Sequence, residues 1–282
     1  MTELISLIVS TYNRPDALGA VLRSLSRQTE KNFEIVIADD GSGPQTRDVI
    51  KSWIPKVGVP LKHVWQEDRG FRLAEIRNRA IRASAGDYLI FLDGDCVARP
   101  DFIAAHRDLA EPGWFVGGNR VLLSQELTEE ILAKNLEPEG WPFSSWAVLR
   151  WRRETNRLLP LLSLPLGALR KRKAQNWQGV RGGNFAFFRA DLDKVDGFET
   201  SFVGWGLEDS DIVIRMIRAG VRRKDGRFAT GVLHLWHKDA DRSGLGANRA
   251  KLDELLKSDR VRALRGLSAL EEDCVIAMSQ GR

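Results

Sequence analysis

The sequence predicts an α/β fold in which a parallel sheet is covered by helices on both faces. Short apolar, β-branched runs of strand length alternate with amphipathic helical stretches, and the connections between them are short. The strands of a parallel sheet are buried on both faces, so they are apolar along their whole length, as these runs are. With 282 residues, the chain is long enough for one large domain of this kind or for two small ones.

The expected elements follow one another in a regular order. Apolar runs predict buried strands at residues 4–10, 33–38, 61–65 and 88–92. Between these runs, apolar residues at helical spacing predict helices at residues 15–25, 49–54 and 73–80. After residue 121 the pattern weakens, and it then resumes with a strand at 182–188, a helix at 208–219, a strand at 228–236 and two tail helices from residue 248 onward.

Composition excludes several classes of protein. Hydrophobic residues make up 43% of the chain and charged residues 29%, which is typical of globular proteins and not of disordered or fibrous ones. Cys96 and Cys274 are too few for a disulfide scaffold and lack metal-site spacing, which indicates a reducing compartment. The N-terminal segment lacks the pattern of a signal peptide. The longest apolar run, 158–169, is broken by Pro160 and Pro165 and is shorter than the roughly 20 residues that span a membrane.

The excess of positive charge lies in one segment, residues 149–173. It holds eight basic residues and one acid, whereas the rest of the chain is slightly acidic. Tryptophans flank its leucine-rich stretch, a composition typical of segments that lie on an anionic membrane surface. A solvated face over an ordinary core helix is an equal alternative. Nucleic acid is not expected as a partner, because the remaining chain offers no basic track.

Acidic residues follow two of the predicted strands. Asp93-Gly94-Asp95 comes directly after the strand at 88–92, where two carboxylates on a glycine turn can share a divalent cation with a diphosphate. Asp40, after the strand at 33–38, can accept hydrogen bonds from a base or a ribose, although a helix cap is the simpler interpretation on its own. The carboxyl ends of parallel strands meet at one sheet edge, so we expect these loops to converge.

Two later motifs add candidate groups. Trp205 lies between two glycines, just before Glu208 and Asp209, which suggests an aromatic face for a sugar beside a carboxylate pair. Helix capping is the simpler alternative for these acids. His234 and His237 follow the last apolar run, and either can complete a Mn²⁺ shell or have a structural role.

The ordered set of motifs resembles glycosyltransferase family 2, the inverting class with the GT-A fold. The motifs are S-x-Y-N-R, I-A-D-D-G-S, R-N-x-A-I, F-L-D-G-D, G-G-N-F-A-F and G-W-G-L-E-D-S-D, within residues 4–121 and 179–238. The last motif also resembles one in β-1,4-galactosyltransferases and chondroitin-polymerase-type enzymes. The resemblance implies a Rossmann-like, mixed and mostly parallel sheet. It further implies a GT-A domain at 1–240, with a nucleotide-binding half (1–121), a Trp-rich basic insert (122–177), an acceptor and base half (178–240), and a helical tail (241–282).

The resemblance also implies roles for single residues. The implied donor-nucleotide site comprises Ser10, Tyr12, Arg14, Asp40, Arg77, Asp93 and Gly94. The implied metal site for Mn²⁺ or Mg²⁺ comprises Asp95, His234 and, as an additional candidate, His237. The implied catalytic base is Asp209, with Glu208 beside it, and the implied sugar and acceptor contacts are Gly183, Asn184 and Trp205.

The expected reaction is metal-dependent transfer of one sugar, with inversion, from a nucleotide-sugar such as a UDP-sugar to a hydroxyl of a glycan or lipid-linked acceptor. Such a reaction fits bacterial cell-surface polysaccharide or lipopolysaccharide assembly. It would take place in the cytoplasm or at the inner face of the plasma membrane, where residues 149–173 could contact anionic lipid.

Departures from the family and two rival functions complete the sequence-based picture. Cys96 stands where many relatives have another acid, and Ala147 stands where processive synthases have the glutamine of Q-x-x-R-W, so we expect a non-processive enzyme. A sugar-phosphate nucleotidyltransferase would need a glycine-rich loop after the first strand, which is absent. A non-catalytic nucleotide-sugar binder would not need Asp93, Asp95 and Asp209 together.

Overall fold

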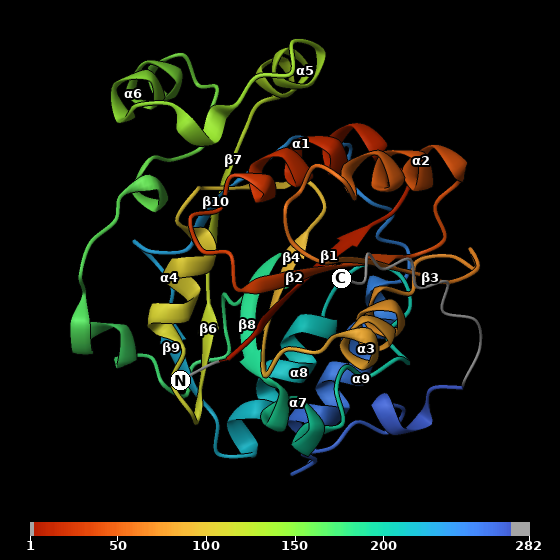
Figure 1. Cartoon of the computed structure of the whole chain (residues 1–282). Coiled ribbons are helices and arrows are strands. Elements are labelled where there is room, and N and C mark those ends of the chain that lie inside the picture. The colour runs from red at the N-terminus through yellow and green to blue at the C-terminus, as the bar shows by residue number, and fades with distance from the viewer. Residues whose placement is uncertain (1–2, 272–282) are drawn as a thin grey trace.

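A computed structural model describes residues 3–271 and confirms the predicted α/β architecture (Figure 1). Within these residues, the main sheet has seven strands. Their order is β3 (Leu61–Trp65), β2 (Phe33–Asp39), β1 (Ile5–Thr11), β4 (Tyr88–Asp93), β8 (Asn184–Phe188), β6 (Trp114–Gly117) and β9 (Arg222–Asp225). The first four strands are parallel and β6 is parallel to β9, whereas β8 is antiparallel to both β4 and β6. The sheet is therefore mixed and mostly parallel, as expected.

A second, three-stranded sheet lies beside the first. It consists of β5 (Cys96–Ala98), β10 (Gly231–His234) and β7 (Asn119–Leu122), with β10 in the middle. β10 is antiparallel to β5 and parallel to β7, so His234 pairs with both Cys96 and Leu122. This small sheet brings the end of the last strand next to the D-x-D turn.

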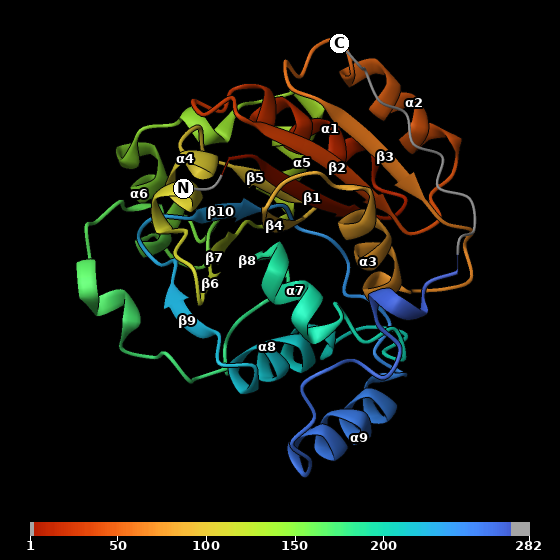
Figure 2. The ribbon, with the colours of Figure 1, turned by 60° about the horizontal axis from the view of Figure 1, so that its bottom comes forward.

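Helices cover both faces of the main sheet (Figures 1 and 2). One face carries α1 (Pro15–Ser26) and α2 (Pro44–Trp53), and the other carries α3 (Leu73–Ala83), α7 (Arg189–Val195) and α8 (Glu208–Arg218). α4 (Phe102–Leu109) packs beside the small sheet, and α9 (Leu245–Leu256) packs on α8. α1 begins with proline at its first position, which suits the fixed φ of that residue.

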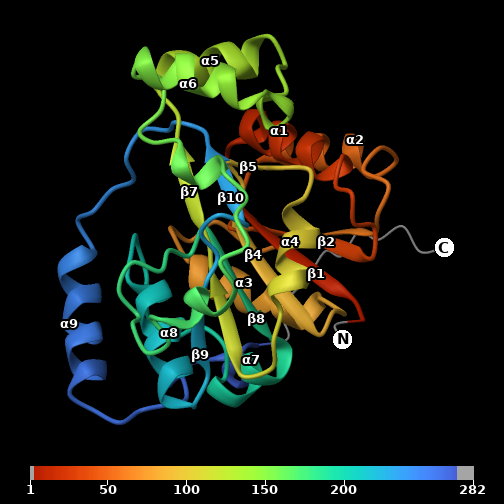
Figure 3. The same cartoon turned by 90° about the vertical axis from the view of Figure 1, so that its left-hand side faces the viewer.

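The segment between β7 and β8 places two helices, α5 (Gln125–Ala133) and α6 (Phe143–Trp151), at one end of the molecule and then runs back along the body (Figure 3). It also contains 3₁₀ turns at Pro138–Gly140, Leu159–Leu161 and Gly167–Lys171. Ser124 caps α5 by accepting a hydrogen bond from the backbone N–H of Leu127. The apolar run at 158–169 is thus a chain of short turns and loops. No helix among residues 3–271 is long and apolar enough to cross a membrane.

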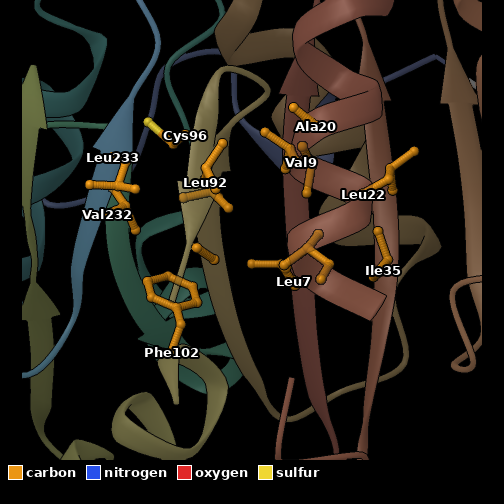
Figure 4. Packing of buried hydrophobic residues seen from close by; sticks show 14 of the residues in the cluster. Leu7, Val9, Ala20, Leu22, Ile35, Leu92, Cys96, Phe102, Val232 and Leu233 are labelled. Atoms are coloured by element: carbon orange, nitrogen blue, oxygen red, sulfur yellow. The ribbon is translucent and has the colours of Figure 1, made fainter. Parts of the chain in front are cut away.

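The two buried cores follow from the alternation of side chains along β1. Leu7 and Val9 face α1 and α2, whereas Ile8 faces α3 and α8. Figure 4 shows Leu7 and Val9 beneath α1, in the same cluster as residues of the small sheet. Burial on both faces explains why these strands lack a polar alternation.

The structure corrects several element boundaries. The strand expected at 228–236 is shortened to β10, because Phe228 has a positive φ of 59° and lies in a turn. The described part of the tail has one α-helix, α9, and a 3₁₀ turn at Leu267–Ala269 where two helices were expected. Cys274 lies outside the described residues.

β9 was not predicted, because its sequence is Arg-Arg-Lys-Asp. Its buried charges have partners instead of water. Arg223 donates hydrogen bonds to the carbonyl oxygens of Asn176 and Gln178, and the Lys224 ammonium lies 2.6 Å from a Glu111 carboxylate oxygen. A charged sequence can therefore form a buried strand here.

The basic segment 149–173 does not present all its charges to solvent. Arg170 is buried and donates hydrogen bonds to the carbonyl oxygens of Asp225, Arg227 and Leu164. Lys171 forms an ion pair with Glu111 at 2.6 Å. These two residues hold the segment against the body, so neither is a free surface charge.

Candidate active site

The carboxyl ends of β1, β2 and β4 meet at one edge of the sheet, as the sequence predicts. In the strand register, Ser10 pairs with Asp93, and Thr11 pairs with Asp39. The backbone N–H of Gly94 donates a 2.7 Å hydrogen bond to the Ser10 carbonyl. A Cβ at position 94 would lie 2.7 Å from that same oxygen, so the turn requires glycine.

Gly183 makes a second close approach to the D-x-D turn. A Cβ at this position would lie 2.3 Å from a carboxylate oxygen of Asp93. The start of β8 therefore passes directly against Asp93, and only glycine leaves room for the carboxylate. Burial raises the pKa of Asp93, and the positive charge of Arg77 opposes that shift.

Arg77, on α3, connects both halves of the site. Its guanidinium is almost fully buried and lies 3.2 Å from Asp93 and 3.3 Å from Glu208. It also donates to the Ser10 hydroxyl at 3.3 Å and to the Gly182 carbonyl at 3.0 Å. These contacts fix two acidic side chains from distant parts of the chain around one cation.

Three potential metal ligands meet beside the D-x-D turn. The carboxylate oxygens of Asp95 lie 3.6 Å from Nε2 of His234 and 3.3 Å from Nε2 of His237. One ligand atom from each of the three residues falls within 4.8 Å of the others. Asp93, Asp95 and Cys96 form a second such group that shares Asp95. Carboxylate oxygen with imidazole nitrogen is a donor set that Mn²⁺ accepts.

Both histidines have surroundings that favour coordination of a metal by a ring nitrogen. Burial lowers the pKa of His234, against the attraction of Asp95, which favours the neutral ring that can coordinate a metal. His237 Nδ1 lies 2.8 Å from the backbone carbonyl of Lys238. A proton on Nδ1 would donate to that carbonyl and leave the lone pair of Nε2 facing Asp95. His237 is therefore a candidate ligand in addition to His234, although its side chain is more exposed.

The carboxylate pair lies at the start of α8. Asp209 accepts hydrogen bonds from the backbone N–H groups of Gly182, at 3.0 Å, and of Ser210, at 2.7 Å. Burial raises the pKa of Glu208 to about 7, with a further contribution from the negative charge of Asp209 and opposition from Arg77. Glu208 thus changes charge near neutral pH.

Asp40 is held as an acceptor and does not cap α2. Its carboxylate accepts hydrogen bonds from the Arg72 backbone N–H at 2.7 Å and from the Gln66 side chain at 2.5 Å. The cap position of α2 is Gly43. Burial raises the pKa of Asp40 to about 6. The nearby Tyr12 hydroxyl donates to Asp68 at 2.9 Å, and the Tyr12 ring is half exposed.

Three residues that were expected to contact the donor or the acceptor have different surroundings in the structure. Arg14 pairs with Asp16 at 3.0 Å on the surface. Trp205 is partly exposed, and the Arg242 guanidinium lies 4.7 Å from its ring centroid. Asn184 is buried, and its amide donates to the carbonyl oxygens of Asn119 and Thr230. Sugar contact by Asn184 stays a prediction, and its geometry supports a role in joining the two sheets.

Several residues at the site were not predicted from the sequence. Arg120, on β7, has a guanidinium nitrogen 3.7 Å from Asp93 and is the second cation on that carboxylate. Gln66, Asp68 and Arg72 hold Asp40 and Tyr12. These residues lie outside any motif, so only the folded arrangement identifies them.

Two family models match the chain. Residues 6–195 match the model described as glycosyl transferase family 2. Residues 168–238 match the model described as the N-terminal domain of galactosyltransferase.

Curated relatives match most of this chain but exceed it in length. A validoxylamine A glucosyltransferase of Streptomyces hygroscopicus is 31% identical over 242 residues, which are 81% of this chain and 55% of that protein. A chondroitin synthase of Escherichia coli is 24% identical over 237 residues, which are 77% of this chain and 32% of that protein. The chain spans about half the length of the first relative and about a third of the second.

Solved structures share the fold. A mannosyltransferase from Pyrobaculum calidifontis in complex with GDP-Man and Mn²⁺ has a TM-score of 0.58 and 20% identity, and the match covers 92% of this chain and 63% of that one. Staphylococcus aureus TarS in complex with UDP has a TM-score of 0.61 and 16% identity, and the match covers 95% of this chain and 67% of that one.

Proposed function

The chain belongs to glycosyl transferase family 2, and from this membership we propose that it transfers one sugar from a nucleotide-sugar donor to an acceptor hydroxyl. The observation that carries the proposal is that the Arg77 guanidinium forms ion pairs with carboxylates of two groups of side chains. One group is the potential metal site around Asp95, and the other is the carboxylate pair Glu208 and Asp209. Transfer needs both groups at one place, because one assists departure of the nucleotide and the other activates the acceptor.

Asp95, His234 and His237 would hold a divalent cation, which supplies positive charge for the departing diphosphate when it is bound. Mn²⁺ suits this donor set better than Mg²⁺, because Mg²⁺ prefers oxygen ligands alone. Arg120 and Arg77 hold Asp93 on the other side of the turn.

Asp40 and Tyr12 would contact the base and ribose of the donor. The fixed carboxylate of Asp40 accepts from donor N–H or hydroxyl groups, and the exposed ring of Tyr12 offers a surface for stacking. Arg77 is buried, so we assign it an indirect role through Asp93 and Glu208. Ser10 contributes to the same arrangement, because its hydroxyl accepts from Arg77.

Asp209 would take the proton from the acceptor hydroxyl that attacks the anomeric carbon. It is less buried than Glu208, and its two backbone hydrogen bonds fix its orientation. Attack from the face opposite the departing diphosphate inverts the configuration. Trp205 would pack against a sugar ring beside this carboxylate.

We propose a glycan or glycolipid acceptor and a role in cell-surface polysaccharide or lipopolysaccharide assembly. The named activities of the relatives, which include the synthesis of the polysaccharide chondroitin, support a carbohydrate acceptor. The UDP bound to TarS and the GDP-Man bound to the mannosyltransferase support a nucleotide-sugar donor, with UDP-sugars as our first choice.

A screen of UDP- and GDP-sugars for release of nucleoside diphosphate tests the proposal. We expect release with Mn²⁺ and its loss when EDTA removes the metal. Calorimetric titration with UDP, with and without Mn²⁺, should show metal-dependent binding. Release of inorganic pyrophosphate from a nucleoside triphosphate and a sugar phosphate would instead identify a nucleotidyltransferase, and binding without any turnover would identify a non-catalytic binding protein.

A further inference from the structure

The outer face of α6 is apolar and exposed. Phe143, Ala147, Val148 and Trp151 follow one another at helical spacing, so they share one side of the helix. Trp151 is 84% exposed, Val148 is 49% exposed and Phe143 is 46% exposed. The opposite side of α6 is occupied, because Trp146 is buried and packs against Trp141, with their ring centroids 5.4 Å apart and the rings tilted by 38°.

An exposed stripe of this kind is unusual for a helix that faces only water. Apolar side chains that are gathered on a surface, instead of scattered singly, mark interaction sites. The helix is held firmly from behind, since α5 packs on α1 and Leu149 packs against the core. The stripe is therefore a fixed feature of the folded protein.

Unpaired positive charge surrounds the stripe. Arg150, Arg152 and Arg153 are exposed, and none has an ion-pair partner among residues 3–271. Glu154, the one acid of the segment, is turned inward to Ser124, whose hydroxyl donates to its carboxylate. This end of α6 therefore carries three arginines against one acid.

No ion pair joins a neighbouring acid to these arginines among residues 3–271. Glu130, on α5, pairs with Lys134 at 2.8 Å on its own helix, and Glu137 and Glu139 pair with Arg27. Glu129 accepts from the neutral side chain of Gln125 at 2.8 Å, so it keeps its charge, as does the exposed Glu126. Positive charge is therefore concentrated at the end of α6, and the nearest helix carries acids of its own.

We propose that the outer face of α6 binds an anionic lipid bilayer. Phe143, Val148 and Trp151 would enter the boundary between headgroups and acyl chains, and the arginines would meet the phosphate groups. Tryptophan favours this boundary because one end of its ring system is polar. The negative charge of an anionic bilayer complements the positive charge of the arginines at the end of α6. At nine residues, α6 can lie along the bilayer but not span it.

The proposed membrane contact is confined to α6 and does not extend over the whole basic segment 149–173. Arg170 and Lys171 are engaged with the body of the protein. Arg172 and Lys173 are exposed and follow a 3₁₀ turn on which Leu169 is 58% exposed, so this turn is a second place where apolar and basic groups meet. α6 differs from it because its exposed apolar residues share one side of a regular α-helix.

The α5–α6 unit begins next to the candidate metal site. The backbone N–H of Leu123, which leads into α5, donates to the carbonyl of His234 at 3.0 Å. If the proposed transferase function holds, a lipid-borne acceptor would reach the site from the bilayer that α6 contacts. Vesicle binding itself does not depend on that function, so the two proposals can fail separately.

Flotation of the purified chain with vesicles tests this proposal. Phosphatidylcholine vesicles with about a third of phosphatidylglycerol should carry the protein upward at low salt, and binding should weaken as salt rises. Pure phosphatidylcholine vesicles should bind much less. No binding to the anionic vesicles, or equal binding to both kinds, would overturn the proposal.

Two α6 variants and two matched controls locate the surface. The triple variant Arg150→Gln, Arg152→Gln, Arg153→Gln should lower the partition coefficient by about 100-fold, which is about fivefold for each charge. Trp151→Ala should lower it by at least about tenfold. Arg172→Gln with Lys173→Gln is the control for charge, and Leu264→Ala, at an apolar residue that is 76% exposed in the C-terminal segment, is the control for apolar area.

The controls and a size measurement decide between occupants. If either control reduces binding as much as its α6 counterpart, the assignment to α6 is wrong. If the parent chain self-associates in analytical ultracentrifugation and Trp151→Ala abolishes this, a second copy of the chain occupies the face. Unchanged thermal melting of the α6 variants shows that lost binding is not lost folding.

Discussion

Replacing Glu208 with glutamine is expected to change how the stability of the protein depends on pH. Burial and the neighbouring Asp209 raise the pKa of Glu208 to about 7, against the attraction of Arg77, whereas the ordinary value is 4.5. Folding therefore favours the protonated form. Glu208 makes its full contribution to stability below pH 4.5, and this contribution is lost as the pH rises through about 7.

The size of the effect follows from the pKa difference. A shift from 4.5 to about 7 corresponds to roughly 3 kcal/mol, at about 1.4 kcal/mol for each unit. Glutamine keeps an oxygen that can accept from Arg77, but it does not titrate and leaves Arg77 without one anionic partner. We therefore expect the free energy of unfolding of the variant, relative to the parent, to rise by about 3 kcal/mol between pH 4.5 and pH 8.

Urea unfolding, followed by tryptophan fluorescence at several pH values, measures this difference. Glu254→Gln is the matched control, because Glu254 is exposed on α9 and the same change there should leave the pH dependence unaltered. If the free energies of unfolding of the parent and of Glu208→Gln run parallel across this pH range, the pKa of Glu208 is not raised by burial and the reasoning is refuted. If the variant instead loses stability relative to the parent as the pH rises, the pKa of Glu208 is lowered in the folded protein and not raised.

Three further predictions concern the reaction. Asp95→Ala should abolish transfer and remove metal-dependent binding of UDP in calorimetry, and undiminished binding would show that the cation is held elsewhere. Asp209→Asn should keep donor binding but lower turnover by about 10²–10⁴-fold, since an amide cannot accept the proton, and near-parental turnover would point to Glu208 as the base. His234→Ala should raise the Mn²⁺ concentration needed for half-maximal activity by about tenfold or more. His237→Ala should raise it less, because His237 is more exposed, and the reverse order would contradict this ranking.

The N-terminal half of the fold could be predicted from sequence because local pattern and tertiary burial agree there. Strands such as β1 are apolar on both faces, which is a strong signal, and the helices between them show one buried stripe. The three loops at the strand ends then follow from the geometry of a parallel sheet. No knowledge of distant contacts is needed for that step.

The second half depends on contacts that the sequence does not display. β9 is a charged tetrapeptide whose burial is possible only because Glu111 and backbone carbonyls meet its side chains. Arg170 belongs to a basic run in the sequence but is a buried hydrogen-bond donor in the fold. In both cases some of the partners lie more than 40 residues away. The composition therefore predicts exposed side chains where the structure has buried ones.

The sequence predicts which residues belong to the site better than it predicts the hydrogen bonds and ion pairs between them. The turn at Asp93 and the pair at Glu208 and Asp209 follow strand and helix ends, where motifs indicate them. Asp40 could be taken as a helix cap until its partners, Gln66 and the Arg72 backbone, are known. Arg120 carries no signal, since a single arginine on a short strand has no pattern around it.

The balance of charge at the site gives an independent argument for a divalent cation. The side chains of Asp93, Asp95, Glu208 and Asp209 are carboxylates. Arg77 forms ion pairs with Asp93 and Glu208, and Arg120 forms one with Asp93. When all four acids are ionised, the group carries two uncompensated negative charges, which the histidines do not offset while their rings are neutral. Burial is the main cause of the raised pKa of Glu208, about 7, and the negative charge of Asp209 adds to it. A divalent cation at Asp95 would offset the excess negative charge and would lower the pKa of Glu208, so metal binding and deprotonation of the carboxylate pair should reinforce each other.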